Sequence, residues 1–318
     1  MTKSENLKRE FKRIRIVHIV VLCAVVFVAF SILGTTLLAA GGPWKSNFSL
    51  RDGLFTVAHG DPVNVDEQVE QELAGLAGVR ITTVSTNVIL TSGGDKVKAD
   101  LKGVCRNLDA PVRLESELHG DVLILEVKHP KQKRWGNWSG SDCSTSLTVM
   151  MPDDYQGDFK IVTVSGDMYA RNLPLILKEV TLETVSGDVD FGIAGCRELS
   201  AKSVSGDLTL RNVASPTSVN TISGDVEIYY EKAAETRVET VSGDVDIAVP
   251  TGESFAVDFQ STSGEFESRY PGLFANDVRR NFHGTVGNGD EHLRINTVSG
   301  DCELKTARQS AVGSHKQF

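Results

Sequence analysis

A short phrase, Ser-Gly-Asp, returns along the second half of this chain and restricts its fold more than any other feature of the sequence. It reads Ser-Gly-Glu once, and its glycines are separated by 21, 19, 18, 19, 21 and 36 residues. A degenerate earlier copy has Ser85, Thr86 and Asn87 in its place. Repetition at a nearly fixed period predicts units that each pack on their neighbours. The phrase residues, which we expect to form structural turns, are Gly166, Asp167, Gly187, Asp188, Gly206, Asp207, Gly224, Asp225, Gly243, Asp244, Gly264, Glu265, Gly300 and Asp301.

Apolar or small residues stand at alternate positions on both sides of each phrase. In one unit Val238 and Thr240 precede it, and Val245 and Ile247 follow it. A period of two predicts half-buried strands, two in each unit of about 19 residues. Between the strands the chain must turn sharply, so we expect glycine to supply a positive φ, and the Ser and Asp side chains to accept bonds from amides of their own turn.

Two all-β architectures satisfy this alternation. One is a β-solenoid with the strands of successive coils stacked in parallel, and the other is an antiparallel hairpin-repeat sheet or sandwich. The nearly constant period favours the solenoid. In both, Cys302 aligns with Val245 at a core position, so a buried free thiol is expected there. The interruption at 268–294 contains Pro, Gly and Asn and is interpreted as a loop that caps the stack.

Stacking the units places the acidic residues of the phrase in a ladder of like charges. At about 5 Å in water each adjacent pair repels by roughly 0.8 kcal/mol, which is tolerable if each carboxylate also accepts amide bonds. A line of calcium ions is the alternative, but one Asp per unit supplies few oxygens for a calcium site. We therefore expect a structural role for the ladder, with no metal and no cofactor.

The N-terminus predicts a membrane anchor. Ile16–Ala40 holds no Asp, Glu, Lys or Arg and is long enough to cross a bilayer. Basic residues precede it, which places the N-terminus in the cytoplasm and the rest of the chain outside. A cleaved secretory signal is the competing interpretation and also exports the domain. The expected divisions are a basic tail at 1–15, a transmembrane helix at 16–40, a juxtamembrane linker and lead-in at 41–78, the repeat domain at 79–305 and a flexible tail at 306–318.

The exported part is acidic. Residues 1–42 hold six of the 33 basic and two of the 42 acidic residues, which leaves 27 basic and 40 acidic residues beyond. This balance argues against a nucleic-acid partner. The expected contact site lies in the segment 128–140, which combines basic and tryptophan side chains suited to a cell-wall polymer, a glycan, lipid headgroups or an envelope protein. The alternative is a solvated hairpin tip. The candidate residues of the contact site are Lys128, Lys131, Lys133, Arg134, Trp135 and Trp138.

Four cysteines lie in the exported part, where disulfides can form. No C-x-x-C spacing occurs, which excludes a zinc knuckle and a thioredoxin-type motif. We expect a disulfide between Cys105 and Cys143, tying the polar insertion around 129–145 to a neighbouring strand. Free buried thiols are the alternative.

The sequence predicts no catalytic residues. The exported histidines are isolated, and G-x-S-x-G and H-E-x-x-H are absent. A carbohydrate-active enzyme on a β-helix remains the alternative, because the Asp ladder could imitate paired carboxylates. A catalytic pair should break the repeat in one or two coils, however, whereas nearly every coil here carries the same residue. Uniformity favours a structural role.

The basic start, the membrane span, the lead-in "VRITTVSTNVILTSGGDKVKADLKG" and the serial "TVSGDV" units ending in "INTVSGDCEL" resemble the putative-adhesin family of bacterial β-strand-repeat envelope proteins. The resemblance covers residues 79–305. It implies a non-enzymatic surface protein that acts by binding, scaffolding or adhesion, with a link to envelope stress responses. A calcium-stabilised adhesin is a further alternative. The tryptophan-bearing insertion and the exported cysteines depart from the family pattern.

Overall fold

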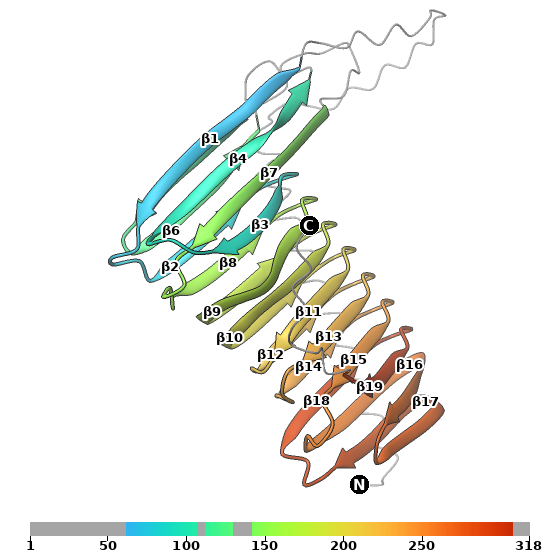
Figure 1. Cartoon of the computed structure of the whole chain (residues 1–318). Coiled ribbons are helices and arrows are strands. Elements are labelled where there is room, and N and C mark those ends of the chain that lie inside the picture. Colours follow the sequence, from blue (N-terminus) through green and yellow to red (C-terminus); the bar gives the residue numbers. More distant parts are fainter. Residues whose placement is uncertain (1–61, 107–111, 130–141, 308–318) are drawn as a thin grey trace, which may run out of the picture.

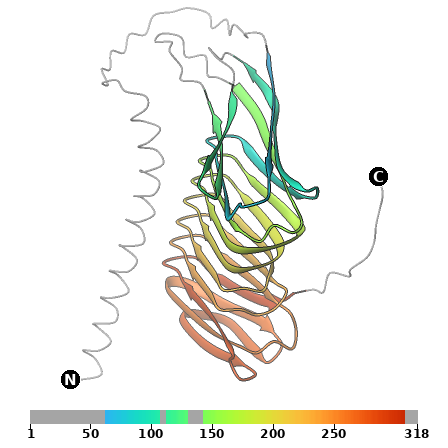
Figure 2. The ribbon, with the colours of Figure 1, turned by 90° about the vertical axis from the view of Figure 1, so that its left-hand side faces the viewer.

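Alternating apolar residues form strands throughout the residues that the computed structural model describes, which are 62–106, 112–129 and 142–307. Nineteen strands run through these ranges, and every regular element in them is a strand. Figures 1 and 2 show the central coils stacked one on another between an antiparallel end formed by β1, β4 and β7 and an opposite end formed by β16 and β17.

Each repeat unit contributes one strand before the phrase and one after it. In one unit these strands are β12 (Thr217–Asn220) and β13 (Val226–Tyr230), and in the next they are β14 (Thr236–Glu239) and β15 (Val245–Val249). β12 pairs with β14 and β13 with β15, both in parallel. We call the strands before the phrase the leading stack and those after it the trailing stack. The parallel pairing confirms the all-β, solenoid-like prediction.

The two stacks run the length of the described domain. The leading stack follows the order β5 (Arg113–His119), β6 (Val122–Lys128), β2 (Gly78–Thr82), β8 (Asp158–Val162), the end of β9 (Met168–Glu183), the end of β10 (Val189–Lys202), β12, β14, β18 (Glu291–Asn296) and the start of β16 (Phe255–Tyr270). The trailing stack follows the order β1 (Val63–Glu72), β4 (Lys96–Arg106), β7 (Asp142–Met151), β3 (Asn87–Ser92), the starts of β9 and β10, β11 (Leu208–Val213), β13, β15, β19 (Cys302–Thr306) and the end of β16. β17 (Leu273–Val286) closes both stacks.

The core lies between the stacks and is built from columns of inward side chains. One column follows the phrase directly, where Leu208, Val226, Val245 and Cys302 lie in register on successive coils. All four are buried. Cys302 is therefore a buried free thiol, as expected, and burial raises its pKa above the ordinary value for a cysteine.

The spatial order of the last units differs from their order in the chain. β18 lies between β14 and the start of β16, and β19 lies between β15 and the end of β16. The final unit, with Gly300, is thus inserted between the units of Gly243 and Gly264. The first coil, β2 and β3, is likewise placed between β6 and β7 on one side and β8 and β9 on the other.

The interpretation of 268–294 as a loop was wrong. Most of it belongs to two strands, since β16 continues to Tyr270 and β17 begins at Leu273. Only Pro271 and Gly272 form the turn between them. The physical reason is hydrophobic packing. Phe282 stacks on Phe266 with ring centroids 4.3 Å apart, and this contact gives β17 a partly buried inner face. The hairpin does close the end of the stack, where its antiparallel pairing ends the parallel repeat.

The opposite end is also antiparallel. β1 pairs with β4, and β4 with β7. β1 falls within the expected lead-in at 41–78, so the strands begin before residue 79. The expected membrane span Ile16–Ala40 lies outside the described residues, as does the tail from 308 onward. Within the described ranges no helix is long and apolar enough to cross a membrane.

Candidate functional site at the Ser-Gly-Asp corner

The phrase forms a corner between the leading and trailing strands, and the corners of successive coils lie above one another. A hydroxyl residue three positions before the glycine organises each turn from within. Thr184 Oγ1 accepts the amide of Gly187 at 2.9 Å, and Ser203 Oγ accepts that of Gly206 at the same distance. The same bond recurs at Gly166, Gly224, Gly243, Gly264 and Gly300. Because these hydroxyls are almost all buried, each bond satisfies an amide that water cannot reach.

This hydroxyl was missed as a functional residue in the sequence. Thr240 was interpreted as a small member of the alternating core pattern, whereas its hydroxyl binds the turn, as do those of Thr184 and Thr221. The signal was present, because Thr or Ser occupies this position in all seven phrase units and at Thr83 in the degenerate copy. Hydroxyl side chains that bond the backbone a few residues on are a common turn device.

The glycines are required for close stacking. A Cβ added to Gly224 would lie 2.0 Å from the carbonyl oxygen of Gly206, and the same contact is 2.0–2.1 Å at the other six corners. The residues with positive φ are all elsewhere in the described chain. The expectation of a positive φ at the phrase was therefore wrong. Glycine is needed because the backbone of one corner lies directly on the next, which leaves no room for a side chain.

The serines bind the preceding coil twice. Both the amide and the hydroxyl of Ser205 donate to the carbonyl of Val185, at 2.9 and 3.2 Å. Ser186, Ser223, Ser242 and Ser299 repeat this arrangement on their own preceding coils. The serines are exposed, yet each is committed to holding two coils together.

The acidic residues form a ladder in which each carboxylate accepts the amide of the next coil. Asp188 Oδ1 accepts the amide of Asp207 at 3.0 Å, and Asp207 Oδ1 accepts that of Asp225 at 2.9 Å. The ladder continues through Asp244 and Asp301 to the amide of Glu265. The expectation of bonds to the residue's own turn was wrong, because the buried hydroxyl already serves that turn. The carboxylates instead link coils, which offsets part of their repulsion.

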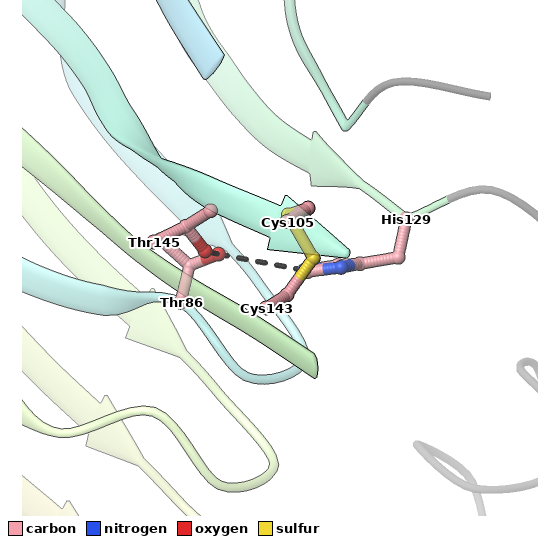
Figure 3. Close-up of a disulfide and its surroundings, with 5 residues drawn as sticks. All are labelled: Thr86, Cys105, His129, Cys143 and Thr145. Carbon is pink, nitrogen blue, oxygen red and sulfur yellow. Dashed lines mark hydrogen bonds between the residues drawn. A yellow bond between two sulfur atoms is a disulfide. The ribbon is translucent and has the colours of Figure 1, made fainter. Parts of the chain in front are cut away.

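The ladder begins at Asn87, which replaces aspartate in the degenerate unit. Its Oδ1 accepts the amide of Asp167 at 3.0 Å, so the amide side chain performs the same bond without charge. Thr86 stands in the place of glycine, and the carbonyl of Thr86 is the atom that Gly166 approaches. Figure 3 shows the Thr86 side chain directed toward Thr145 and His129. The Thr86 hydroxyl lies 2.7 Å from that of Thr145 and 3.4 Å from His129 Nε2.

Cys105 and Cys143 are joined by a disulfide beside this cluster (Figure 3). They face each other on β4 and β7, in register with Val63 of β1. The bond closes a segment with a sequence separation of 38 residues. Burial lowers the pKa of His129, so this imidazole is neutral at neutral pH.

Most of the basic and aromatic candidates lie outside the described residues, namely Lys131, Lys133, Arg134, Trp135 and Trp138. Lys128 is described, and its ammonium lies 2.6 Å from a Glu115 carboxylate oxygen and 3.7 Å from one of Glu126. Its charge is therefore engaged on the surface of the leading stack. β6 ends at Lys128 and β7 begins at Asp142, so the segment between them starts and ends beside the disulfide.

The carboxylates of the ladder lie one per coil along the corner. Among the described residues, no group of three or more His, Cys, Asp or Glu side chains is arranged to hold a metal ion. The inner oxygen of each linking carboxylate is already occupied by an amide hydrogen bond, and calcium requires six to eight oxygen ligands. The chemistry that the corner supports is therefore hydrogen bonding along a rigid edge.

Parallel coils joined at stacked glycine corners and closed by antiparallel strands at both ends define this protein as a capped β-solenoid. The chain belongs to the Toastrack DUF4097 family, whose model matches residues 79–227 and 210–305. This match confirms the resemblance seen in the sequence.

Several solved structures of bacterial proteins match the chain. One is a putative cell adhesion protein from Clostridium sporogenes, with 13% identity, a TM-score of 0.36, and coverage of 77% of this chain and 100% of that one. Another is a putative adhesin from Bacteroides fragilis, with 17% identity, a TM-score of 0.40, and coverage of 77% and 97%. A third is a putative adhesin from Parabacteroides merdae, with 10% identity, a TM-score of 0.36, and coverage of 78% and 97%. No curated protein matches the chain.

Proposed function

We propose that this protein is a non-enzymatic scaffold of the bacterial cell envelope, anchored through Ile16–Ala40 and binding a partner outside the cytoplasm. The observation that carries the proposal is the uniform corner. Its threonines, serines, glycines and inner carboxylate oxygens are all used in bonds within or between coils. A catalytic pair would need carboxylates that are free of these bonds. The corner therefore does not support the alternative of a carbohydrate-active enzyme.

The geometry of the antiparallel end supports a contact at the membrane side. Val63, Cys105 and Cys143 lie in one row across β1, β4 and β7. The chain therefore enters the domain at the same end from which the segment 130–141 leaves. If residues 16–40 anchor the protein, the basic and tryptophan side chains of that segment are tethered near the membrane surface, where lipid headgroups and cell-wall polymers are concentrated. Both carry anionic groups that suit Lys and Arg, and Trp favours the interface.

A retention assay tests this role. The soluble chain from residue 41 onward is mixed with anionic liposomes or isolated cell wall and sedimented. Replacing Trp135, Trp138, Lys131 and Lys133 with alanine in one variant should abolish retention. A control with Lys202→Ala and Lys232→Ala removes the same charge from the solenoid body and should retain binding. Unchanged retention of the first variant would contradict the contact site.

A further inference from the structure

A ridge of aliphatic side chains runs along the Ser-Gly-Asp edge beside the carboxylate ladder. The residue before the serine is β-branched and apolar in seven of the eight stacked units. The carbonyl of each accepts bonds from the serine of the next coil, which places these residues above one another. Val84 is 38% exposed, and the others are half-buried. The ridge consists of Val84, Val164, Val185, Val204, Ile222, Val241 and Val298.

The fold itself does not need an aliphatic side chain at this place. The side chains point away from the core, and the stacking bonds use only their carbonyl groups. In the terminal unit the position is taken by Thr262, which is exposed and whose next residue, Ser263, keeps the serine bonds to Val298. A polar β-branched residue is thus structurally sufficient. A continuous, partly exposed apolar stripe with no structural requirement indicates an interaction surface.

Uncompensated negative charge runs next to the ridge. Five ladder carboxylates have no Lys, Arg or His within ion-pair distance among the described residues: Asp188, Asp207, Asp225, Asp244 and Asp301. Some acidic side chains elsewhere on the described surface are paired with cations. Asp190, on the outer surface of the trailing stack, is paired with both Arg171 and Arg211. The corner therefore carries a continuous row of carboxylates with no cation beside them in the described part of the chain.

The occupant of this edge must complement both stripes. A second copy of the edge carries the same charge and would be repelled. An extended strand fits poorly, because its side chains on one face recur at about 6.7 Å, whereas the coils recur at about 4.8 Å. An α-helix advances about 5.4 Å per turn, so its side chains at i, i+4 and i+7 nearly match the coil spacing. The seven ridge positions extend over about 29 Å at the inter-strand spacing, which a helix of about five turns would cover.

We propose that the Ser-Gly-Asp edge docks a basic amphipathic α-helix of a partner protein. Leucine-type side chains of the helix lie against the ridge from Val84 to Val298, and Lys or Arg side chains beside them meet the carboxylates from Asp188 to Asp301. This inference names a protein partner for the scaffold proposed above and rests on that role, but it uses a surface separate from the segment 128–140.

The chain supplies its own conservative substitutions for the test. Thr262 shows that threonine is accepted on the ridge, and Asn87 shows that asparagine keeps the ladder bond. The ridge variant is therefore V164T/V185T/V204T/V241T, and the ladder variant is D188N/D207N/D225N/D244N. A charge control, D153N/D154N/E198Q/E231Q, removes four exposed acidic groups away from the edge.

The probe is a synthetic 21-residue helix with leucines along one stripe and lysines beside it, and its matched control has glutamate in place of lysine. Binding to the full chain in detergent micelles is followed by fluorescence anisotropy at two salt concentrations. The basic helix should bind, and the ridge and ladder variants should each raise its Kd at least tenfold. The charge control and a Trp135→Ala/Trp138→Ala variant should leave the Kd within about twofold.

Two results would overturn the proposal. One is that the basic helix does not bind, although the circular dichroism spectrum of the protein shows that the protein is folded. The other is an equal loss of affinity in the ladder variant and the charge control with no loss in the ridge variant, which would show only unspecific attraction between opposite charges. Because the tryptophan variant is measured in the same assay, failure of the membrane-side contact and failure of this edge are distinguished.

Discussion

The corner glycines have no tolerance for a side chain, and Gly224→Ala tests this directly. The added Cβ would lie 2.0 Å from the Gly206 carbonyl oxygen, against a normal contact of about 3.2 Å for carbon and oxygen, so the coils must separate by about 1.2 Å. This displacement would stretch the two bonds from Ser223 to Val204 and the bond from Asp225 to Asp207, now 2.9–3.3 Å, beyond hydrogen-bonding distance.

Three lost bonds at about 1 kcal/mol each predict a destabilisation of about 3 kcal/mol. For a domain of this size that corresponds to a fall in Tm of about 6–12 °C. The matched control is Gly195→Ala, because a Cβ there meets nothing within 4 Å and its φ is not positive. Thermal and urea unfolding of both variants measure the difference. Equal stability of the two variants would refute the close stacking of the corners.

Four further perturbations probe other parts of the structure. Thr221→Val keeps the shape but removes the acceptor of the buried Gly224 amide, so urea unfolding should show a loss of about 1–3 kcal/mol, whereas Thr221→Ser should lose less. The D188N/D207N/D225N/D244N variant keeps the bonds between coils without their repulsion, so its Tm should rise less than that of the wild type between 20 and 500 mM salt; an equal rise would contradict the ladder of charges. Cys105→Ala/Cys143→Ala removes a disulfide that spans a sequence separation of 38 residues and should lower the unfolding free energy by about 4 kcal/mol. A loss below 1 kcal/mol would contradict the structural role of the disulfide. Adding EDTA should leave the Tm unchanged, and a large fall would restore the calcium interpretation.

The repeat made the architecture predictable, because its period and alternation required stacked strands around a common core. The alignment of Cys302 with Val245 placed a buried thiol correctly for the same reason. The role of the glycines could not be obtained from one unit. A glycine suits a positive φ and a close backbone contact equally well, and only the neighbouring coil distinguishes the two.

The spatial order of the last units was beyond the sequence. A gap of 36 residues between Gly264 and Gly300 is compatible with two coils or with a hairpin, and the choice depends on how the aromatic side chains of β16 and β17 pack against the end of the core. The sequence likewise could not show which amides donate to the ladder carboxylates. The sequence shows an aspartate in each unit, but whether it binds its own turn or the next depends on the hydroxyl residue that already serves the turn.

The order of coils at the corner provides the most direct test of the whole account. In a Cys196→Ser background, Ser242 is replaced by cysteine together with either Ser299 or Ser263, and disulfide formation is followed under mild oxidation. Ser299 lies one coil from Ser242, within the about 4.4–6.8 Å between Cα atoms that a disulfide requires, and Ser263 lies two coils away. The structure predicts rapid crosslinking of the 242–299 pair and none of the 242–263 pair. Crosslinking of 242 with 263 alone would show that the units stack in chain order and would contradict the structure described.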